Sequence, residues 1–134
     1  MTILWIDEYS VHVKLIDEQH KRFFQLLDMV TSAFYAGKNN IEIEEVFKEL
    51  FEYRDYHFKT EEEYFKKFNF EGAPPHIAEH NAFDEQVSQM YLEVKKDKLA
   101  TTVKLIEFME DWLVHHIDFV DKQYTKCFND HGLY

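Results

Sequence analysis

The chain has 134 residues, which suits one domain and is long enough to bury a real core. Only 3 glycines and 2 prolines are present, which argues against a turn-rich β protein, and the single cysteine, Cys127, excludes an intramolecular disulfide. The formal net charge of −11 disfavours a phosphate backbone or an anionic membrane surface as a partner, so we expect no binding of nucleic acid.

The sequence predicts neither export nor insertion into a membrane. A signal peptide is not predicted, because the first residues lack a basic segment followed by a long apolar run. No stretch approaches 18 apolar residues, so no transmembrane helix is predicted. We therefore expect a cytoplasmic protein.

The predicted elements are an N-terminal arm followed by four long helices. Breaks at 37–40, 69–75 and 95–98 separate the helical segments, because Gly and Asn end helices and Pro-Pro cannot continue one. The arm is predicted over about 1–15, with Trp5 as its anchor, and the helices over about 16–37, 41–68, 75–95 and 99–128. This order predicts a single all-α domain over 1–134, an up-down-up-down four-helix bundle.

Each predicted helix has one apolar face, with steps of three and four residues. The four stripes are Ile16, His20, Phe23, Leu27, Val30 and Phe34; Ile43, Val46, Leu50, Tyr53, His57, Glu61, Tyr64 and Phe68; His76, His80, Phe83, Val87, Met90 and Val94; and Leu105, Met109, Trp112, His116, Phe119 and Gln123. Every stripe contains at least one of the 8 histidines, so the stripes predict a core that includes imidazoles.

The inward histidines point to a metal site. His57 and Glu61 are one helical turn apart, as are His76 and His80, and such pairs chelate well because the helix fixes both ligands. A lone histidine such as His20 is more often a hydrogen-bonded core residue than a ligand. Five imidazoles and a carboxylate on shared inner faces, however, are costly to bury unless metal satisfies them. Nitrogen and carboxylate donors suit iron, zinc, copper or nickel, and five or more donors exceed one tetrahedral zinc site, so we predict two metal ions.

Spacing alone does not decide which residues complete the metal site. His116 and Asp121 are five residues apart, which places them about 140° apart on a regular helix. His115 and Asp118 are better spaced, but their face of the helix is charged and reads as exposed. If Asp121 is a ligand, we predict a π-type turn between His116 and Asp121, or a carboxylate that reaches round from the flank of the helix.

Four motifs, in order, give the chain its family resemblance. Together they resemble the hemerythrins, specifically the single-domain bacterial type. They are Trp5 followed by Ile16-Asp17-Glu18-Gln19-His20-Lys21; His57-Phe58-Lys59-Thr60-Glu61-Glu62, which resembles HFxxEE; His76-Ile77-Ala78-Glu79-His80, which resembles HxxxH; and Trp112-Leu113-Val114-His115-His116-Ile117 with Asp121 and Tyr124, which resembles WLxxHIxxxD.

The resemblance implies a non-haem di-iron site with an oxo or hydroxo bridge. His76, His80 and His116 would bind one iron, and His20 and His57 the other. Glu61 and Asp121 would bridge the two. The iron with two histidines would keep an open position, where O2 binds end-on and takes two electrons from the pair, and the proton of the bridging hydroxide would hydrogen-bond to the resulting peroxide.

The function that the resemblance implies is reversible O2 binding, for transport, storage, delivery to an O2-using enzyme or sensing, by a protein that is not an enzyme. A di-iron redox, peroxide-handling or iron-handling role is the alternative. Several of Phe23, Leu27, Phe58 and Trp112 are expected to wall the site, which would limit proton delivery and oxidation. Tyr124 is the one nearby proton donor expected.

Three other readings are weaker. Ferritin-like di-iron sites use Glu-x-x-His pairs, and no histidine here has Glu three residues before it. The sequence from His76 to His80 also fits the HxxEH signature of zinc peptidases, with Glu79 as general base, but that short pattern leaves the other inward histidines unexplained. A bundle that only binds a protein partner would need no inward histidines. His12, His115 and His131 are expected to face solvent and not to bind the metals.

Overall fold

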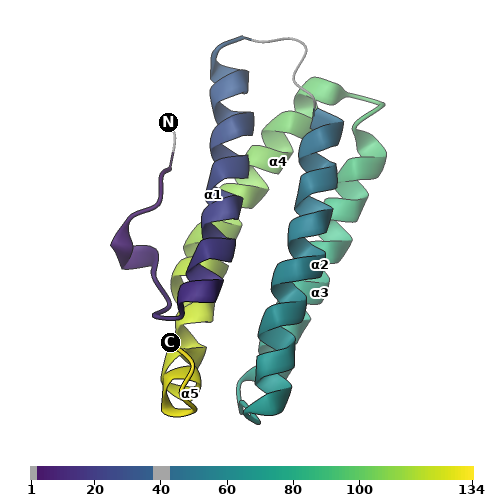
Figure 1. Cartoon of the computed structure of the whole chain (residues 1–134). Coiled ribbons are helices and arrows are strands. Elements are labelled where there is room, and N and C mark those ends of the chain that lie inside the picture. Colours follow the sequence, from purple (N-terminus) through teal and green to yellow (C-terminus); the bar gives the residue numbers. More distant parts are fainter. Residues whose placement is uncertain (1–2, 38–42) are drawn as a thin grey trace.

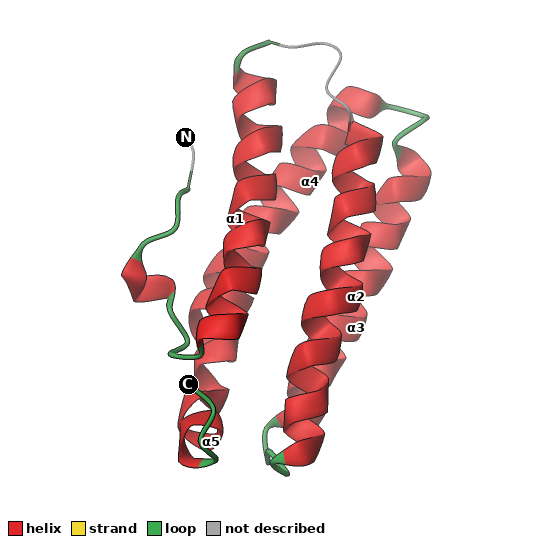
Figure 2. Cartoon of the chain, viewed as in Figure 1, coloured by secondary structure: helices red, strands yellow, loops and turns green. Residues whose placement is uncertain are grey.

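The computed structural model describes residues 3–37 and 43–134. Its main helices are α1 (Lys14–Tyr35), α2 (Ile43–Lys67), α3 (Ala73–Glu93) and α4 (Lys98–Trp112). Short elements precede and follow them in the chain, namely η1 (Asp7–Tyr9) before α1, and η2 (Leu113–Val120), η3 (Asp121–Tyr124) and α5 (Thr125–Asp130) after α4. The described residues contain helices and no strand, as Figure 2 shows. No described helix is long and apolar enough to cross a membrane.

The four main helices form the predicted bundle. Each runs opposite to the one before it, and α1 packs against α2 and α4 while α3 packs against α2 and α4 (Figure 1). The break at 69–75 starts α3 rather than merely ending α2, because Pro74 and Pro75 occupy its first turn, where their missing N–H groups are not needed. Asp97 caps α4 by accepting a hydrogen bond from the amide of Ala100 at 3.0 Å. The predicted break after Gly37 and the predicted start of the second helix at 41 lie outside the described residues.

The N-terminal arm is tied to the bundle at two places. Trp5 packs edge-on against Phe24 of α1, with ring centroids 5.4 Å apart, which confirms the predicted anchor. Asp17 accepts hydrogen bonds from the hydroxyl of Ser10 at 2.5 Å and from the amide of Val11 at 2.9 Å. The arm therefore covers α1 (Figure 1) and delivers the chain into its first turn.

The core has two apolar clusters. The larger one fills the bundle on one side of the inward histidines and includes Phe23, Tyr53 and Phe83. The smaller one lies toward α5 and includes Ile16, Phe65, Tyr124 and Phe128. Along α1, His20 lies between a member of the smaller cluster, Ile16, and a member of the larger one, Phe23. The polar side chains are thus sealed between two apolar layers.

The last segment is not the single regular helix predicted over 99–128. After α4 the backbone widens into the π-helical η2, and the amide of Asp121 donates to the carbonyl of His116, five residues back. The predicted π-type turn is therefore confirmed.

The π-helical turn also changes which side chains face the core. The stripe predicted to continue through Phe119 and Gln123 is wrong, because Phe119 is 61% exposed and Gln123 is also exposed. The additional residue in the widened turn shifts the inner face by one position. Val120, Tyr124 and Phe128 are buried instead.

The surplus residue in η2 predicts an unusual tolerance to deletion. Deleting exposed Phe119 should let η2 relax to a regular helix while everything after it keeps its face. Deleting exposed Glu107 from the regular helix α4 should rotate all later residues by about 100°. We expect the melting temperature of the Phe119 deletion to be much closer to that of the parent protein than the melting temperature of the Glu107 deletion. Equal losses in melting temperature for the two deletions would contradict this.

Candidate metal centre

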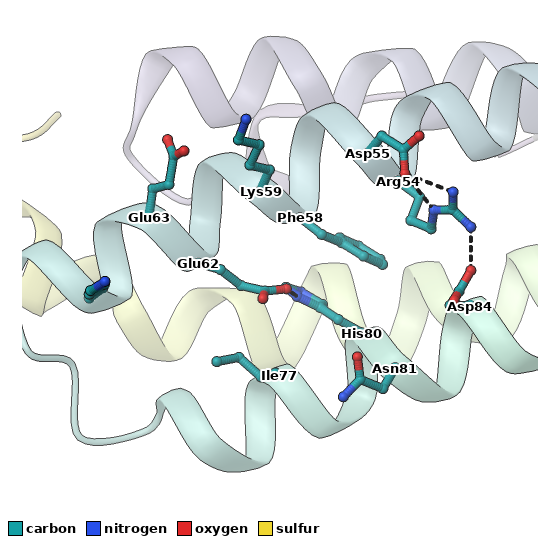
Figure 3. Close-up of a pocket in the computed structure, with 11 residues that line it drawn as sticks. Arg54, Asp55, Phe58, Lys59, Glu62, Glu63, Ile77, His80, Asn81 and Asp84 are labelled. Carbon is teal, nitrogen blue, oxygen red and sulfur yellow. Dashed lines mark hydrogen bonds and ion pairs between the residues drawn. The ribbon is translucent and has the colours of Figure 1, made fainter.

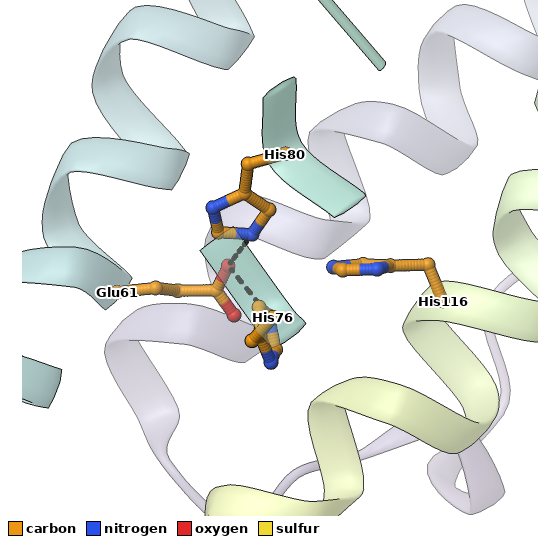
Figure 4. A group of neighbouring side chains, drawn as sticks. All are labelled: Glu61, His76, His80 and His116. Carbon is orange, nitrogen blue, oxygen red and sulfur yellow. Dashed lines mark ion pairs between the residues drawn. The ribbon is translucent and has the colours of Figure 1, made fainter. Parts of the chain in front are cut away.

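All seven residues predicted as metal ligands lie together in the middle of the bundle. Each side chain is buried, and the described helices contribute them as follows: His20 from α1, His57 and Glu61 from α2, His76 and His80 from α3, His116 from η2 and Asp121 from η3. Figure 4 shows Glu61 of α2, His76 and His80 of α3, and His116 of η2 converging on one point. The sequence-predicted constellation is thus a single cluster in space.

Helix geometry sets the ligand pairs. One turn of α2 places Nε2 of His57 3.2 Å from Oε1 of Glu61. One turn of α3 brings the rings of His76 and His80 to 4.7 Å between centroids. The widened turn of η2 does the same for residues five apart, and Nε2 of His116 lies 3.0 Å from Oδ1 of Asp121. The π-helical turn is therefore what places Asp121 in the cluster.

The cluster has two parts that share two carboxylates. We call His76, His80 and His116 the three-histidine half, and His20 and His57 the two-histidine half. Asp121 directs Oδ1 at His76, 3.0 Å away, and Oδ2 at His20, 2.9 Å away. Oε1 of Glu61 lies 3.1 Å from His80 and 3.2 Å from His57.

The donor atoms fit metal ions better than they fit one another. Among the described residues, several buried atoms that face this centre have no well-aligned hydrogen bond in spite of their short separations. They are Nε2 of His76, His80 and His116, Oε1 of Glu61, and both carboxylate oxygens of Asp121. Unsatisfied buried polar atoms are rare and costly. Two groups of these side chains bring one donor atom each within 4.8 Å of the others, one group in each half, with Glu61 in both.

Hydrogen bonds behind the rings fix which nitrogen faces the centre. Nδ1–H of His57 donates to Gln19 at 2.7 Å. In the three-histidine half, His80 donates to Glu62 at 2.7 Å and His116 donates to Glu79 at 2.9 Å. A proton held on Nδ1 leaves the Nε2 lone pair free for a metal, and an acidic partner makes that lone pair more basic.

The three-histidine half is closed by flat stacking. Phe58 lies 3.8 Å from the ring of His80 at 2°, and Trp112 lies 3.9 Å from the ring of His116 at 14°. These contacts confirm two of the four predicted apolar walls. Phe23 instead packs against Tyr53, and Leu27 is part of the larger apolar cluster.

A surface pocket lies outside this half. It has a volume of about 570 Å³ between α2 and α3, and Figure 3 shows Glu62, Phe58 and His80 on its wall. His80 is nevertheless only 2% exposed. The Phe58 ring and the Glu62 carboxylate therefore separate the donor atoms from the solvent in that pocket.

Tyr124 supports one of the shared carboxylates. Its hydroxyl donates to Oε2 of Glu61 at 2.5 Å, deep in the smaller apolar cluster. Burial, together with the charges of Glu61 and Asp121, raises the pKa of Tyr124 well above its usual value, so it stays a neutral donor. This contact leaves Oε1 of Glu61 to face the histidines.

Charge pairing dominates the cluster in the absence of metal. Burial lowers the pKa of His76, but the carboxylates of Asp121 and Glu61 outweigh it and raise the pKa to about 10. The pKa of His116 is also raised, since Asp121 again outweighs burial. Burial opposes ionisation of Glu61 and Asp121, yet the facing histidines hold the pKa of both carboxyl groups below the ordinary range.

Four neighbours of the centre were missed by sequence reasoning alone. Gln19, Glu62 and Glu79 were not assigned a role as partners of the rings, although Gln19 and Glu62 lie directly beside predicted ligands. Tyr53 was counted only as an apolar stripe residue, and its position one turn before His57 was the signal available.

The histidines expected to be non-ligands lie outside both clusters. His12 and His131 are exposed, and His131 stacks on Phe68. The side chain of His115 is 67% exposed and lies 3.5 Å from Glu79. The alternative pair of His115 and Asp118 is therefore wrong.

The pKa values predict how the metal-free protein responds to pH. A histidine with a raised pKa stabilises the fold fully below its unfolded value of about 6.5, and this contribution is lost as pH rises toward 10. The carboxylates stabilise above about pH 4 and lose this effect in acid. Urea unfolding of metal-free protein should therefore show stability falling from pH 6.5 to 9, and Asp121→Asn should flatten that slope. A stability that rises over this interval would contradict the charge pairing.

The chain resembles known proteins over most of its length. The Hemerythrin HHE cation binding domain matches residues 11–127. A bacteriohemerythrin of Clostridium acetobutylicum is 26% identical over 90% of this chain and 97% of its own, and a bacteriohemerythrin of Methylococcus capsulatus is 29% identical over 90% and 91%. A crystal structure of a leucine-to-tyrosine mutant of hemerythrin superposes with a TM-score of 0.79, at 28% identity, over 95% of this chain and 98% of that one.

These matches agree with the two buried clusters of histidine and carboxylate side chains, which are typical of a di-iron site. The match also covers the four main helices in order. The chain is a cation-binding member of the hemerythrin family.

Proposed function

We propose that this protein holds two iron ions and binds O2 reversibly between its four helices. The observation that carries the proposal is the sharing of Glu61 and Asp121 between the two halves of the cluster. Each carboxylate contacts an imidazole of both halves at 3.2 Å or less. Two metal ions bridged by these carboxylates would satisfy the unpaired Nε2 atoms and carboxylate oxygens of the cluster at once.

The donor set suits iron in the proposed arrangement. His76, His80 and His116 would hold one ion, His20 and His57 the other, and Glu61 and Asp121 would bridge them. Imidazole and carboxylate together favour a transition metal, and seven donors exceed one tetrahedral site. Relatives named bacteriohemerythrin and myohemerythrin support the hemerythrin resemblance, which implies iron with an oxo or hydroxo bridge.

The two halves differ in a way that suggests where O2 binds. The two-histidine half supplies one imidazole fewer, so its ion would keep an open position. When bound, the two ions supply the electrons that O2 takes up. The chain excludes bulk water there, since His20 and His57 are at most 1% exposed.

The contacts of Glu79 speak against the zinc peptidase alternative. A general base in an HxxEH site would face the metal-bound water. Here Glu79 accepts from Nδ1 of His116 and also lies 3.5 Å from His115, behind the ring rather than in front of it. His76 and His80 belong instead to a cluster of five imidazoles.

The metal content provides the first test. Protein grown with ample iron should contain two irons per chain. Asp121→Asn should lower that number, because an amide is neutral and a weaker bridge. Asp130→Asn, an exposed change in the following helix, is the matched control and should keep both ions. A value near one iron per chain in the parent protein, or zinc as the dominant native metal, would contradict the di-iron proposal.

Reversible O2 binding is tested on reduced protein. Adding O2 without other oxidant should produce visible charge-transfer absorption, and purging should remove it and restore the diferrous spectrum. The apolar surroundings are the reason to expect reversal, since they limit proton delivery. Immediate conversion to the diferric form without any oxygenated species, even at low temperature, would instead favour a redox, peroxide-handling or iron-handling role.

A further inference from the structure

Tyr53 carries a buried hydroxyl that makes no hydrogen bond to any residue that the structure describes. The residue is 6% exposed and lies one turn before His57 on the inner face of α2. A buried hydroxyl normally finds a partner, because it gives up hydrogen bonds to water when it is buried. The hydroxyl of Tyr53 therefore has an unused donor next to the metal centre.

Two ring contacts hold Tyr53 against a proposed ligand of the two-histidine half. The centroid of its ring lies 5.0 Å from that of His57 with an angle of 26° between the planes, and Phe23 packs against it at 5.5 Å. The stack places the phenol of Tyr53 directly beside the imidazole of a proposed ligand. The charges of Asp121 and Glu61 act on the same hydroxyl and, after burial, are what raise the pKa of Tyr53. The hydroxyl is thus close to the two-histidine half.

Tyr124 is also a buried phenol beside the centre, and its hydroxyl has a hydrogen-bond partner. Tyr124 donates to Glu61 at 2.5 Å and supports a bridging carboxylate. The charges of the same two carboxylates act on Tyr53, but its hydroxyl donates to neither of them. The difference marks the Tyr53 hydroxyl as free for a group that binds between the helices.

We propose that Tyr53 is a ligand-binding residue, whose hydroxyl donates a hydrogen bond to a small acceptor held at the two-histidine half. The ligand class is O2 or a small anion, both of which present an electron-rich outer atom. The inference rests on the proposed function, because the open metal position supplies the other contact to the ligand. Tyr53 remains a neutral donor in this role, and no proton leaves it.

A surface pocket reaches the same residue. A pocket of about 350 Å³ between α1 and α2 is lined by Tyr53, Gln19, Tyr56 and Leu15, with Glu18, Glu49, Glu52 and Arg22. Two of these residues touch His57, since Tyr53 stacks on it and Gln19 accepts its Nδ1–H. The three carboxylates outnumber the one arginine, so a neutral molecule such as O2 should approach more easily than an anion.

Tyr53→Phe tests the hydrogen bond, with Tyr56→Phe as its matched control. Tyr56 is on the same helix and lines the same pocket, but it is 61% exposed. Loss of one such hydrogen bond should speed O2 dissociation from reduced, oxygenated Tyr53→Phe by about fivefold. Azide bound to the diferric protein should weaken by a similar factor, and Tyr56→Phe should match the parent in both. Unchanged O2 and azide binding in Tyr53→Phe would overturn the inference.

Two measurements do not depend on how well that variant loads iron. In metal-free protein, Tyr53→Phe should melt no lower than the parent, because no internal hydrogen bond is lost, while Tyr124→Phe should melt lower. A clear loss for Tyr53→Phe would overturn the inference by showing an internal partner. A crystal structure of the diferric parent with azide should place the phenol oxygen within about 3.2 Å of the azide, and a separation beyond hydrogen-bond reach would overturn it too.

The azide experiments also separate the two proposals. Failure to bind O2 reversibly would overturn the proposed function, yet azide would still report on Tyr53 in the diferric protein. Reversible O2 binding with no effect of Tyr53→Phe would leave the function standing and remove only the inference.

Discussion

The rest of the structure depends on one arrangement, in which two buried carboxylates face five buried imidazoles. Burying a carboxylate alone would cost free energy, and so would burying an Nε2 atom that has no partner. The apolar clusters on either side exclude water, so they strengthen whatever attraction holds the centre. A proton on His76 can offset part of the negative charge of the carboxylates. That proton, however, forms a hydrogen bond with only one lone pair. Metal ions satisfy several at once, and metal binding is then coupled to the stability of the whole bundle.

The π-helical turn shows that the site, rather than local helix preference, decides the backbone. A regular helix would carry Asp121 to the flank of the bundle. In η2 the backbone hydrogen bonds are not spaced as in an α-helix, and Nε2 of His116 lies 3.0 Å from Oδ1 of Asp121. Such turns are less favourable than α-helix and persist where function or packing requires them. Here the same turn also brings Tyr124 onto the inner face, where it reaches Glu61.

Sequence periodicity predicted most of the fold and left specific errors. The stripes of the third helix and most of the first two are buried as expected, because regular helices keep 3.6 residues per turn throughout. The fourth stripe failed after His116, where that period changes, and exposed Phe119 is the result. Ligand pairs one turn apart could be predicted from spacing. Asp121 needed the family resemblance, since spacing alone left His115 and Asp118 as alternatives.

Residues that act behind the ligands were the hardest to predict, because their role depends on contacts between helices. Glu79 serves His116, 37 positions away, and nothing in the sequence links the two. Tyr53 shows the same limit in another form. An aromatic residue on an inner stripe fits a simple core position, and only its missing hydrogen-bond partner distinguishes it.

The supports of the two halves are unequal, and this inequality bears on function. In the three-histidine half, two rings have carboxylate partners and flat aromatic neighbours. In the two-histidine half, His57 has a neutral partner in Gln19, and Nδ1 of His20 has none within the described chain. Acidic partners make imidazole a stronger donor. An ion in the three-histidine half would therefore be held more firmly. The two-histidine half combines weaker support with one imidazole fewer and an unused phenol, and under the proposed function these properties would suit a ligand that must leave again.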